Sequence, residues 1–213
     1  MKKLFFLFTL LLPMVASAHD IEVPNADGVT IYYDYTNNGT KLAVSYQGDS
    51  YSSYTNEYSG NVVIPASVTY GGKTYPVTSI GSEAFRDCSS LTSVKIPNSV
   101  KSIGLRAFRG CSDLIIVYIP NSVMSIDEGT FYECTSLQYM EIPNSVTSIG
   151  DGAFCDCTAL TRVTIPNSVT SIGELTFCAC SGLTSVNIPN SVTSIGLHAF
   201  YYCIRLTSII SVR

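Results

Sequence analysis

Apolar and polar positions repeat along this chain with a period of 23 residues, as from Pro97 to Pro120. Most copies carry an L-x-x-V-x-I segment, and because alternate residues of a strand point to opposite faces, Val94 and Ile96 share one face. The proline that follows has no N–H and ends the strand. A fixed period in the twenties predicts a solenoid in which each copy forms one rung and stacked rungs share a core.

The second half of each copy leads back to the next strand. Val100 and Ile103 re-enter the core, and the glycine after them is expected to permit a positive-φ turn or a helix cap. Asp127 is the exception in a glycine column that comprises Gly81, Gly104, Gly150, Gly173 and Gly196. The following x-x-Ala-Phe piece is expected to form one short helical or 3-10 turn. Its aromatic rings should stack in the core: Phe85, Phe108, Phe131, Phe154, Phe177 and Phe200.

The repeated motif reads A-F-x-x-C-x-x-L-x-x-V-x-I-P-x-S-V-x-S-I-G and covers about residues 60–210. It resembles the BspA-like repeats, a bacterial leucine-rich-repeat surface protein family. The resemblance implies a β-rich α/β fold, a right-handed solenoid with a parallel sheet on its concave side. It also implies cell-surface adhesion or host interaction. Where such repeats carry an inward Asn or Cys, this chain has Ser99, Ser122, Ser145, Ser168 and Ser191.

The N-terminal residues 1–18 read as a secretory signal peptide. Lys2 and Lys3 precede an apolar run from Leu4 to Val15, and Ala16-Ser17-Ala18 forms a small-x-small cleavage site. The run is shorter than the ~20 residues that cross a bilayer. We therefore expect an exported bacterial protein, secreted or held at the cell surface, that has no membrane span.

Residues 19–59 are expected to form an N-terminal β cap and a loop. Residues 28–47 predict a hairpin that turns at Asn37-Asn38-Gly39, whereas 48–60 predict a loop. The solenoid then spans 60–213, with an irregular first rung at 60–87, regular rungs at 88–202 and an incomplete rung at 203–213. In the first rung, Gly71-Gly72 predicts an inserted hairpin.

The chain has few charged residues and few residues suited to catalysis. The formal net charge is −4 and no basic run exists, which argues against nucleic acid and anionic membranes as partners. The two histidines, His19 and His198, stand at opposite ends of the sequence. The repeats therefore contain almost no histidine from which a Ser-His-Asp or Cys-His catalytic site could be built. We expect a protein that is not an enzyme, without cofactor or metal.

Six cysteines follow the repeat and are expected to be free thiols in the core: Cys88, Cys111, Cys134, Cys157, Cys180 and Cys203. Cys155 and Cys178 are additional and also lie one period apart. They can be unpaired, or they can form a disulfide between neighbouring rungs. A four-thiolate zinc site with Cys157 and Cys180 is disfavoured, because alternate residues of an extended chain point in opposite directions.

The outward positions of the strands vary in a way that suggests a binding surface. Most copies carry small polar residues there, but a group of larger side chains interrupts them: Ile116, Tyr118, Tyr139, Glu141 and Arg162. Aromatic residues beside an arginine are typical of interface hot spots. Sequence drift among residues that favour strands is the alternative. The hypothesis is a concave face that binds a protein or glycan.

The last copy breaks off after Leu206 and Ile209. A final strand carrying Ile209 and Ile210 would be an open edge, which favours pairing with another chain. Self-association through this edge, as a structural or assembling repeat protein, is the alternative function. A fragment of a longer array would end in the same way.

Overall fold

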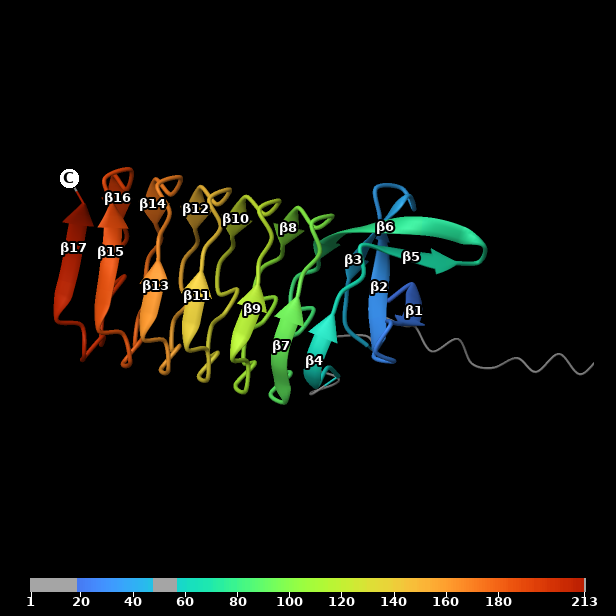
Figure 1. The fold of residues 1–213 in the computed structure, drawn as a ribbon, viewed down its shortest axis with the longest axis horizontal. Coiled ribbons are helices and arrows are strands. Elements are labelled where there is room, and N and C mark those ends of the chain that lie inside the picture. The colour runs from blue at the N-terminus through green and yellow to red at the C-terminus, as the bar shows by residue number, and fades with distance from the viewer. Residues whose placement is uncertain (1–18, 48–56, 213) are drawn as a thin grey trace, which may run out of the picture.

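The computed structural model describes residues 19–47 and 57–212. It confirms a β-solenoid of stacked rungs, which follow one another in a row (Figure 1). We call the sheet facing the viewer in that figure the front sheet. Its strands are β4 (Gly60–Val63), β7 (Leu91–Lys95), β9 (Ile116–Tyr118), β11 (Tyr139–Glu141), β13 (Arg162–Thr164), β15 (Ser185–Pro189) and β17 (Ser208–Val212).

Shorter strands form the other side of each rung, which we call the rear sheet. They are β8 (Ser102–Ile103), β10 (Ser125–Ile126), β12 (Ser148–Ile149), β14 (Ser171–Ile172) and β16 (Ser194–Ile195). All pairings between rungs are parallel and, apart from β4 with β7, where the register shifts, they keep equivalent residues opposite one another, as in Val163 opposite Val186. The predicted parallel solenoid therefore follows from stacking equivalent residues.

The predicted phenylalanine stack is confirmed in the middle of each rung. Successive rings from Phe85 to Phe200 have centroids 4.9 to 5.4 Å apart and planes within 2 to 13° of parallel. The five rings from Phe85 to Phe177 are fully buried. Burial of rings of this size contributes about 2–3 kcal/mol each, so the stack is a main source of cohesion between rungs.

Three of the five serines in the repeated column also connect neighbouring rungs. The hydroxyl of Ser168 donates a hydrogen bond to the carbonyl oxygen of Val146 in the preceding rung at 2.6 Å. Ser122 and Ser145 make the equivalent bonds. These side chains satisfy carbonyl groups that the short rear strands leave unpaired.

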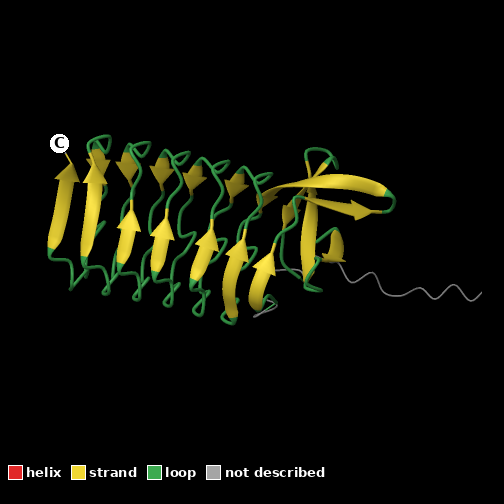
Figure 2. Ribbon diagram, viewed as in Figure 1, coloured by secondary structure: helices red, strands yellow, loops and turns green. Residues whose placement is uncertain are grey.

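The expected helical turn after each glycine is wrong: the described residues contain neither an α-helix nor a 3-10 helix (Figure 2). Tight turns replace it, with positive φ at two positions per rung, such as Glu83 (59°) and Asp87 (55°). These positions recur at the 23-residue step and interrupt any helix. Alternate N–H groups of the turns instead donate to the next rung, as from Phe154 to the carbonyl of Thr176 at 2.8 Å. We call this side of the molecule the turn edge.

The glycine column has a different cause from the predicted one. Gly104 and Gly150 do not have positive φ. Instead, a Cβ at Gly150 would lie 2.7 Å from the backbone nitrogen of Glu128, because the rungs approach closely there. Asp127 does carry a Cβ, and its rung has no strand pairing between β8 and β10 among the described residues. The exception in the column thus coincides with a gap in the rear sheet.

The N-terminal hairpin is confirmed. Strands β2 (Thr30–Thr36) and β3 (Lys41–Val44) pair antiparallel, and β3 then runs parallel to β6 (Lys73–Ile80). An additional strand that the sequence did not reveal, β1 (Ile21–Pro24), pairs with β2. The predicted signal peptide lies outside the described residues.

The inserted hairpin is also confirmed. Strand β5 (Ser67–Tyr70) pairs antiparallel with β6 across Gly71-Gly72, which have φ of 57° and 78°. This hairpin extends away from the row of rungs (Figure 1). The loop expected over 48–60 lies mostly outside the described residues, but its end is core: Tyr58 is fully buried and β4 begins at Gly60.

Candidate ligand-binding face

The predicted surface residues lie side by side on the front sheet. Register places Tyr139 of β11 opposite Arg162 of β13, and Lys95 of β7 opposite Tyr118 of β9. The Tyr118 side chain is 57% exposed and that of Tyr139 is 41% exposed. Strand alternation accounts for this, because the intervening Val117 and Met140 are buried in the core. The face therefore presents two aromatic rings to solvent.

A hollow of about 260 Å³ lies between β9 and β11. Four of the five predicted residues contribute to its walls: Ile116, Tyr118, Tyr139 and Glu141. Asn121 and Pro143 also line it, although the sequence analysis did not single them out. Arg162 does not line the hollow but stands next to Tyr139 in the sheet.

A second hollow of about 550 Å³ borders the other side of Tyr118. It is lined by Lys95, Asn98 and Pro120, among others. Tyr118 is therefore a wall shared by two depressions, one flanked by a carboxylate and the other by an ammonium group. Lys95 and Asn98 are ordinary repeat positions, and only the neighbouring tyrosine makes them part of a site.

The front sheet is interrupted where the first hollow lies. Among the described residues, β9 and β11 are not hydrogen-bonded, so β4-β7-β9 and β11-β13-β15-β17 are separate sheets. Met140 occupies the core position where other rungs have Val94, Val117, Val163 and Val186. A longer core side chain needs more room than valine, which is consistent with the parted strands. The hollow thus arises from the separation of the two strands as well as from the side chains that line it.

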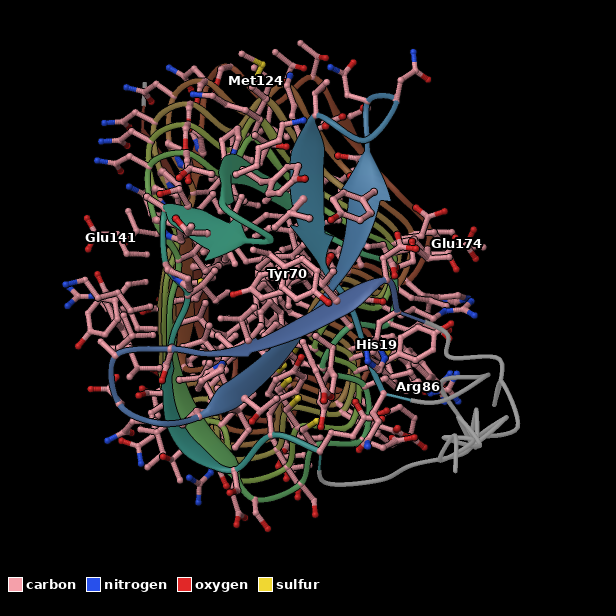
Figure 3. All side chains as sticks on the ribbon, turned by 90° about the vertical axis from the view of Figure 1, so that its right-hand side faces the viewer. His19, Tyr70, Arg86, Met124, Glu141 and Glu174 are labelled. Carbon is pink, nitrogen blue, oxygen red and sulfur yellow. The ribbon has the colours of Figure 1, made fainter. Side chains whose placement is uncertain are left out.

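The charges on this face are unpaired. Among the residues that the structure describes, neither Glu141 nor Arg162 has a salt bridge. Viewed along the row of rungs, Glu141 and Glu174 lie on opposite sides of the molecule (Figure 3). An exposed charge without a protein partner remains available to a ligand.

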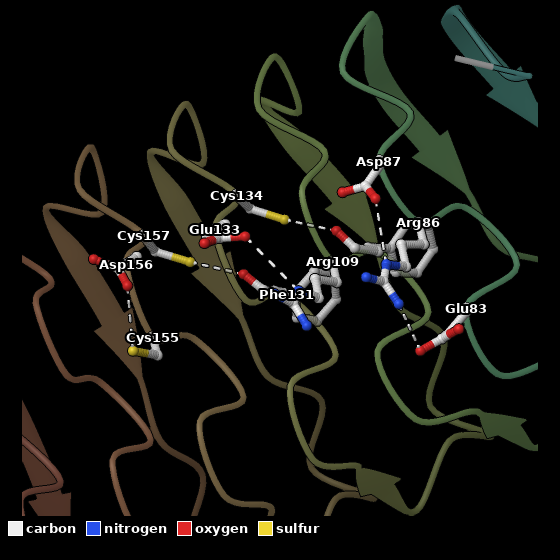
Figure 4. Close-up of polar contacts among 11 residues, drawn as sticks. Glu83, Arg86, Asp87, Arg109, Phe131, Glu133, Cys134, Cys155, Asp156 and Cys157 are labelled. Atoms are coloured by element: carbon white, nitrogen blue, oxygen red, sulfur yellow. Dashed lines mark hydrogen bonds and ion pairs between the residues drawn. The ribbon is translucent and has the colours of Figure 1, made fainter. Parts of the chain in front are cut away.

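The arginines of the turn edge, by contrast, are engaged. Arg86 contacts Glu83 at 3.1 Å, and Arg109 contacts Glu133 at 3.7 Å (Figure 4). Arg106 donates to Glu128 at 2.7 Å in the next rung. A hollow of about 470 Å³ lies beside these pairs, lined in part by Arg106, Arg109, Glu128 and Tyr132. Its arginines are already bound to carboxylates, so the edge is a weaker candidate for a site than the front sheet.

The cysteine column is buried from Cys88 to Cys180, whereas Cys203 in the last described rung is partly buried. The thiol of Cys157 donates to the carbonyl of Phe131 in the preceding rung at 3.2 Å, and its column partners from Cys111 to Cys203 repeat the contact (Figure 4). Burial raises the pKa of the Cys88 thiol to about 12. A thiol that stays protonated is a poor nucleophile and metal ligand.

Other predicted chemistry does not come together. His198 is exposed in a positive-φ turn, and His19 contacts Tyr32 in the cap. Within 19–47 and 57–212, no group of three histidine, cysteine or acidic side chains could hold a metal ion. The same residues include no helix suited to crossing a bilayer.

The repeat matches the model of the BspA type leucine rich repeat region, in six copies over residues 76–210. The chain belongs to this family. Solved structures of bacterial leucine-rich-repeat proteins share the fold. One from Bacteroides ovatus is 33% identical with a TM-score of 0.64, and the match covers 84% of this chain and 51% of that protein. One from T. pallidum is 27% identical with a TM-score of 0.67, covering 84% and 88% respectively.

A leucine-rich cell surface protein from Faecalibacterium prausnitzii is 30% identical, with a TM-score of 0.62. The match covers 90% of this chain and 55% of that protein. The chain therefore spans about half the length of this protein and of the B. ovatus protein. Among curated proteins, none is similar enough to count as a relative. This BspA-type repeat protein is thus similar to bacterial surface proteins.

Proposed function

We propose that this BspA-type protein is exported and binds an extracellular protein or glycan on its front sheet, without catalysing a reaction. Adhesion or host interaction at the bacterial surface is the expected setting. The hollow between β9 and β11, with its exposed tyrosines and unpaired charges, is the observation that carries the proposal.

The chemistry of the hollow suits recognition. Tyrosine gives broad apolar contact at a low cost in side-chain entropy, and its ring stacks on the faces of sugars or apolar side chains. Glu141 accepts hydrogen bonds, whereas the guanidinium of Arg162 donates several in a fixed geometry. These two groups lie in neighbouring strands, so one ligand can meet both signs of charge.

Surface proteins among the similar structures support the setting, as does the predicted signal peptide. The F. prausnitzii protein is a cell surface protein. Our proposal extends this location to the present chain.

The test is a binding screen of residues 19–213 against extracellular-matrix proteins and a glycan array. A Tyr118→Ala/Tyr139→Ala/Arg162→Ala variant is measured beside the parent protein. We expect the variant to lose at least tenfold in affinity, since hot-spot truncations typically cost about 2 kcal/mol or more. A Ser185→Ala/Asn187→Ala variant, altered elsewhere on the front sheet, should bind like the parent. Equal binding by all three proteins would refute the front-sheet site.

Self-association through the last described rung is a second candidate. Its apolar side chains are exposed, including Ile204 at 76%, Ile209 at 56% and Ile195 at 49%. Among the described residues, strand β17 pairs only with β15, which leaves its other edge available to a second copy.

Sedimentation of residues 19–213 over a range of concentrations tests this candidate. The substitution Ile209→Lys places a charge on the exposed edge strand and should shift the protein towards monomer. Met124→Lys is a matched control, because Met124 is 68% exposed and directly precedes β10, which lies far from β17 in the row (Figure 1). A parent protein that remains monomeric at high concentration would eliminate the candidate.

A further inference from the structure

Cys155 and Cys178 occupy the same position in neighbouring rungs of the turn edge. The flanking backbone is held in register by two hydrogen bonds of 2.8 Å. The N–H of Phe154 donates to the carbonyl oxygen of Thr176, and the N–H of Asp156 donates to the carbonyl oxygen of Cys178. The adjacent rings of Phe154 and Phe177 are 5.3 Å apart. The two rungs are thus stacked at about one strand spacing, and such a spacing falls within the roughly 4.4–6.8 Å between Cα atoms that a disulfide spans.

Both residues are free thiols, and the side chain of Cys178 lies near enough to Cys155 to raise the pKa of the Cys155 thiol. The core cysteines repeat at the same step, but their thiols donate to phenylalanine carbonyls in the preceding rung. The Cys155 thiol instead donates to the Asp156 carboxylate, so among the described residues this neighbouring pair is not tied to the carbonyl groups that engage the core column.

We propose that Cys155 and Cys178 form a redox-active dithiol that closes to a disulfide between adjacent rungs in an oxidising compartment. The bond would clamp two rungs on the side of the molecule opposite to the front sheet. It does not depend on what the front sheet binds.

The oxidant is a low-molecular-weight disulfide of the surrounding medium. Cys178 loses its proton and attacks one sulfur of that disulfide, forming a mixed disulfide and releasing one thiol. Cys155 then loses its proton and attacks the Cys178 sulfur, releasing the second thiol. Two protein thiols are oxidised and one external disulfide is reduced to two thiols, so atoms and electrons balance.

The order of attack follows from exposure and charge. Cys178 is partly exposed, whereas Cys155 is 6% exposed. The carboxylate of Asp156 accepts a hydrogen bond from the Cys155 thiol at 3.6 Å (Figure 4). Burial raises the pKa of Cys155, and the neighbouring Cys178 and Asp156 raise it further. Because thiolate is the nucleophile, Cys178 is the entry point and Cys155 closes the bond.

The experiment incubates reduced residues 19–213 with glutathione disulfide at pH 8. Remaining thiols are counted by maleimide labelling after denaturation, and the linked peptide is identified by mass spectrometry. We expect two of the eight thiols to disappear, joined as Cys155–Cys178. Cys155→Ser should stop at a glutathione adduct on Cys178. Loss of no thiols, loss spread over the core column, or a stable adduct on the parent protein would overturn the proposal.

Two further measurements separate a clamp from incidental oxidation. Asp156→Asn removes the carboxylate and keeps a residue that tolerates positive φ, so ring closure should become several-fold faster. The oxidised protein should melt roughly 5 °C or more above the reduced protein, because the bond closes a loop of one repeat. The Cys155→Ser variant should show no such shift in melting temperature. The mechanism would be contradicted if Asp156→Asn closed the disulfide no faster than the parent protein, and if the oxidised and reduced parent proteins melted at the same temperature.

Discussion

The two ends of the row of rungs are finished in different ways. At the N-terminal end, Tyr58 is fully buried with its ring centroid 4.5 Å from that of Phe85. Its hydroxyl donates to the carbonyl of Ser45 at 2.8 Å and accepts from the N–H of Tyr32 at 3.1 Å. At the other end, Phe200 stacks on Phe177 on one face and is only partly buried. A rung therefore becomes core only when something covers both of its faces.

The same column of residues shows this directly. Ile172 is 2% exposed, whereas Ile195, one repeat later, is 49% exposed. Both isoleucines sit in an identical Ser-Ile-Gly context. Burial in this protein is thus set by a residue's neighbours along the row and not by its own rung.

The largest expected effect comes from removing the N-terminal cover. Tyr58→Ala should lower the free energy of unfolding by about 3–5 kcal/mol, because it leaves a cavity against Phe85 and unpairs the Tyr32 N–H. Tyr201→Ala, at the opposite end, should change it by less than about 0.5 kcal/mol, since Tyr201 is 51% exposed. Urea unfolding followed by circular dichroism measures both. Similar losses in the two variants would break the contrast between the ends.

A smaller effect is expected within one column. Ile172→Ala should cost about 2–4 kcal/mol, as expected for a buried isoleucine, and Ile195→Ala about 1 kcal/mol, because half of its side chain is already in water. The same unfolding measurement serves for both. If Ile195→Ala costs as much as Ile172→Ala, the last described rung is covered in solution, most simply by a second copy.

The smallest effect concerns pH and the N-terminal cap. Burial raises the pKa of Glu57 from 4.5 to about 7. The folded cap therefore favours the protonated acid, so its stabilising contribution is present below pH 4.5 and is lost as pH rises through 7. Half of the group is solvated, which limits the loss to about 1–2 kcal/mol. Thermal melting at pH 5 and pH 8 measures it, and Glu57→Gln should remove this part of the pH dependence.

Much of the fold could be predicted because the repeat constrains it many times over. Six phenylalanines at one spacing leave little choice but a stack, and Gly71-Gly72 between strand residues specifies a tight hairpin. The turn edge was predicted wrongly because its positive-φ positions carry residues as different as Glu83, Leu175 and His198. Stacking contacts impose that conformation against local preference, and only Gly110, Gly129 and Gly152 hint at it.

The outward placement of the candidate residues could be predicted, but the hollow between them could not. Alternation along the strands identifies Tyr118 and Tyr139 as outward residues. The hollow between them depends on parted strands beside Met140, which a pattern of apolar positions does not distinguish from valine. Tyr58 was missed for a similar reason, because a serine- and tyrosine-rich segment gives no periodic sign of a core residue.

The contacts between rungs also determine how the gene can change. The threonine, serine and cysteine side chains reach back by constant offsets of 23, 22 and 26 residues. Deleting or duplicating one whole copy in frame preserves every one of these offsets, whereas an insertion of any other length disrupts all those that cross it. The stretch at 142–150 recurs verbatim at 165–173 and 188–196, so neighbouring copies are interchangeable over these residues. Recombination can therefore lengthen or shorten this array while its cross-section stays the same.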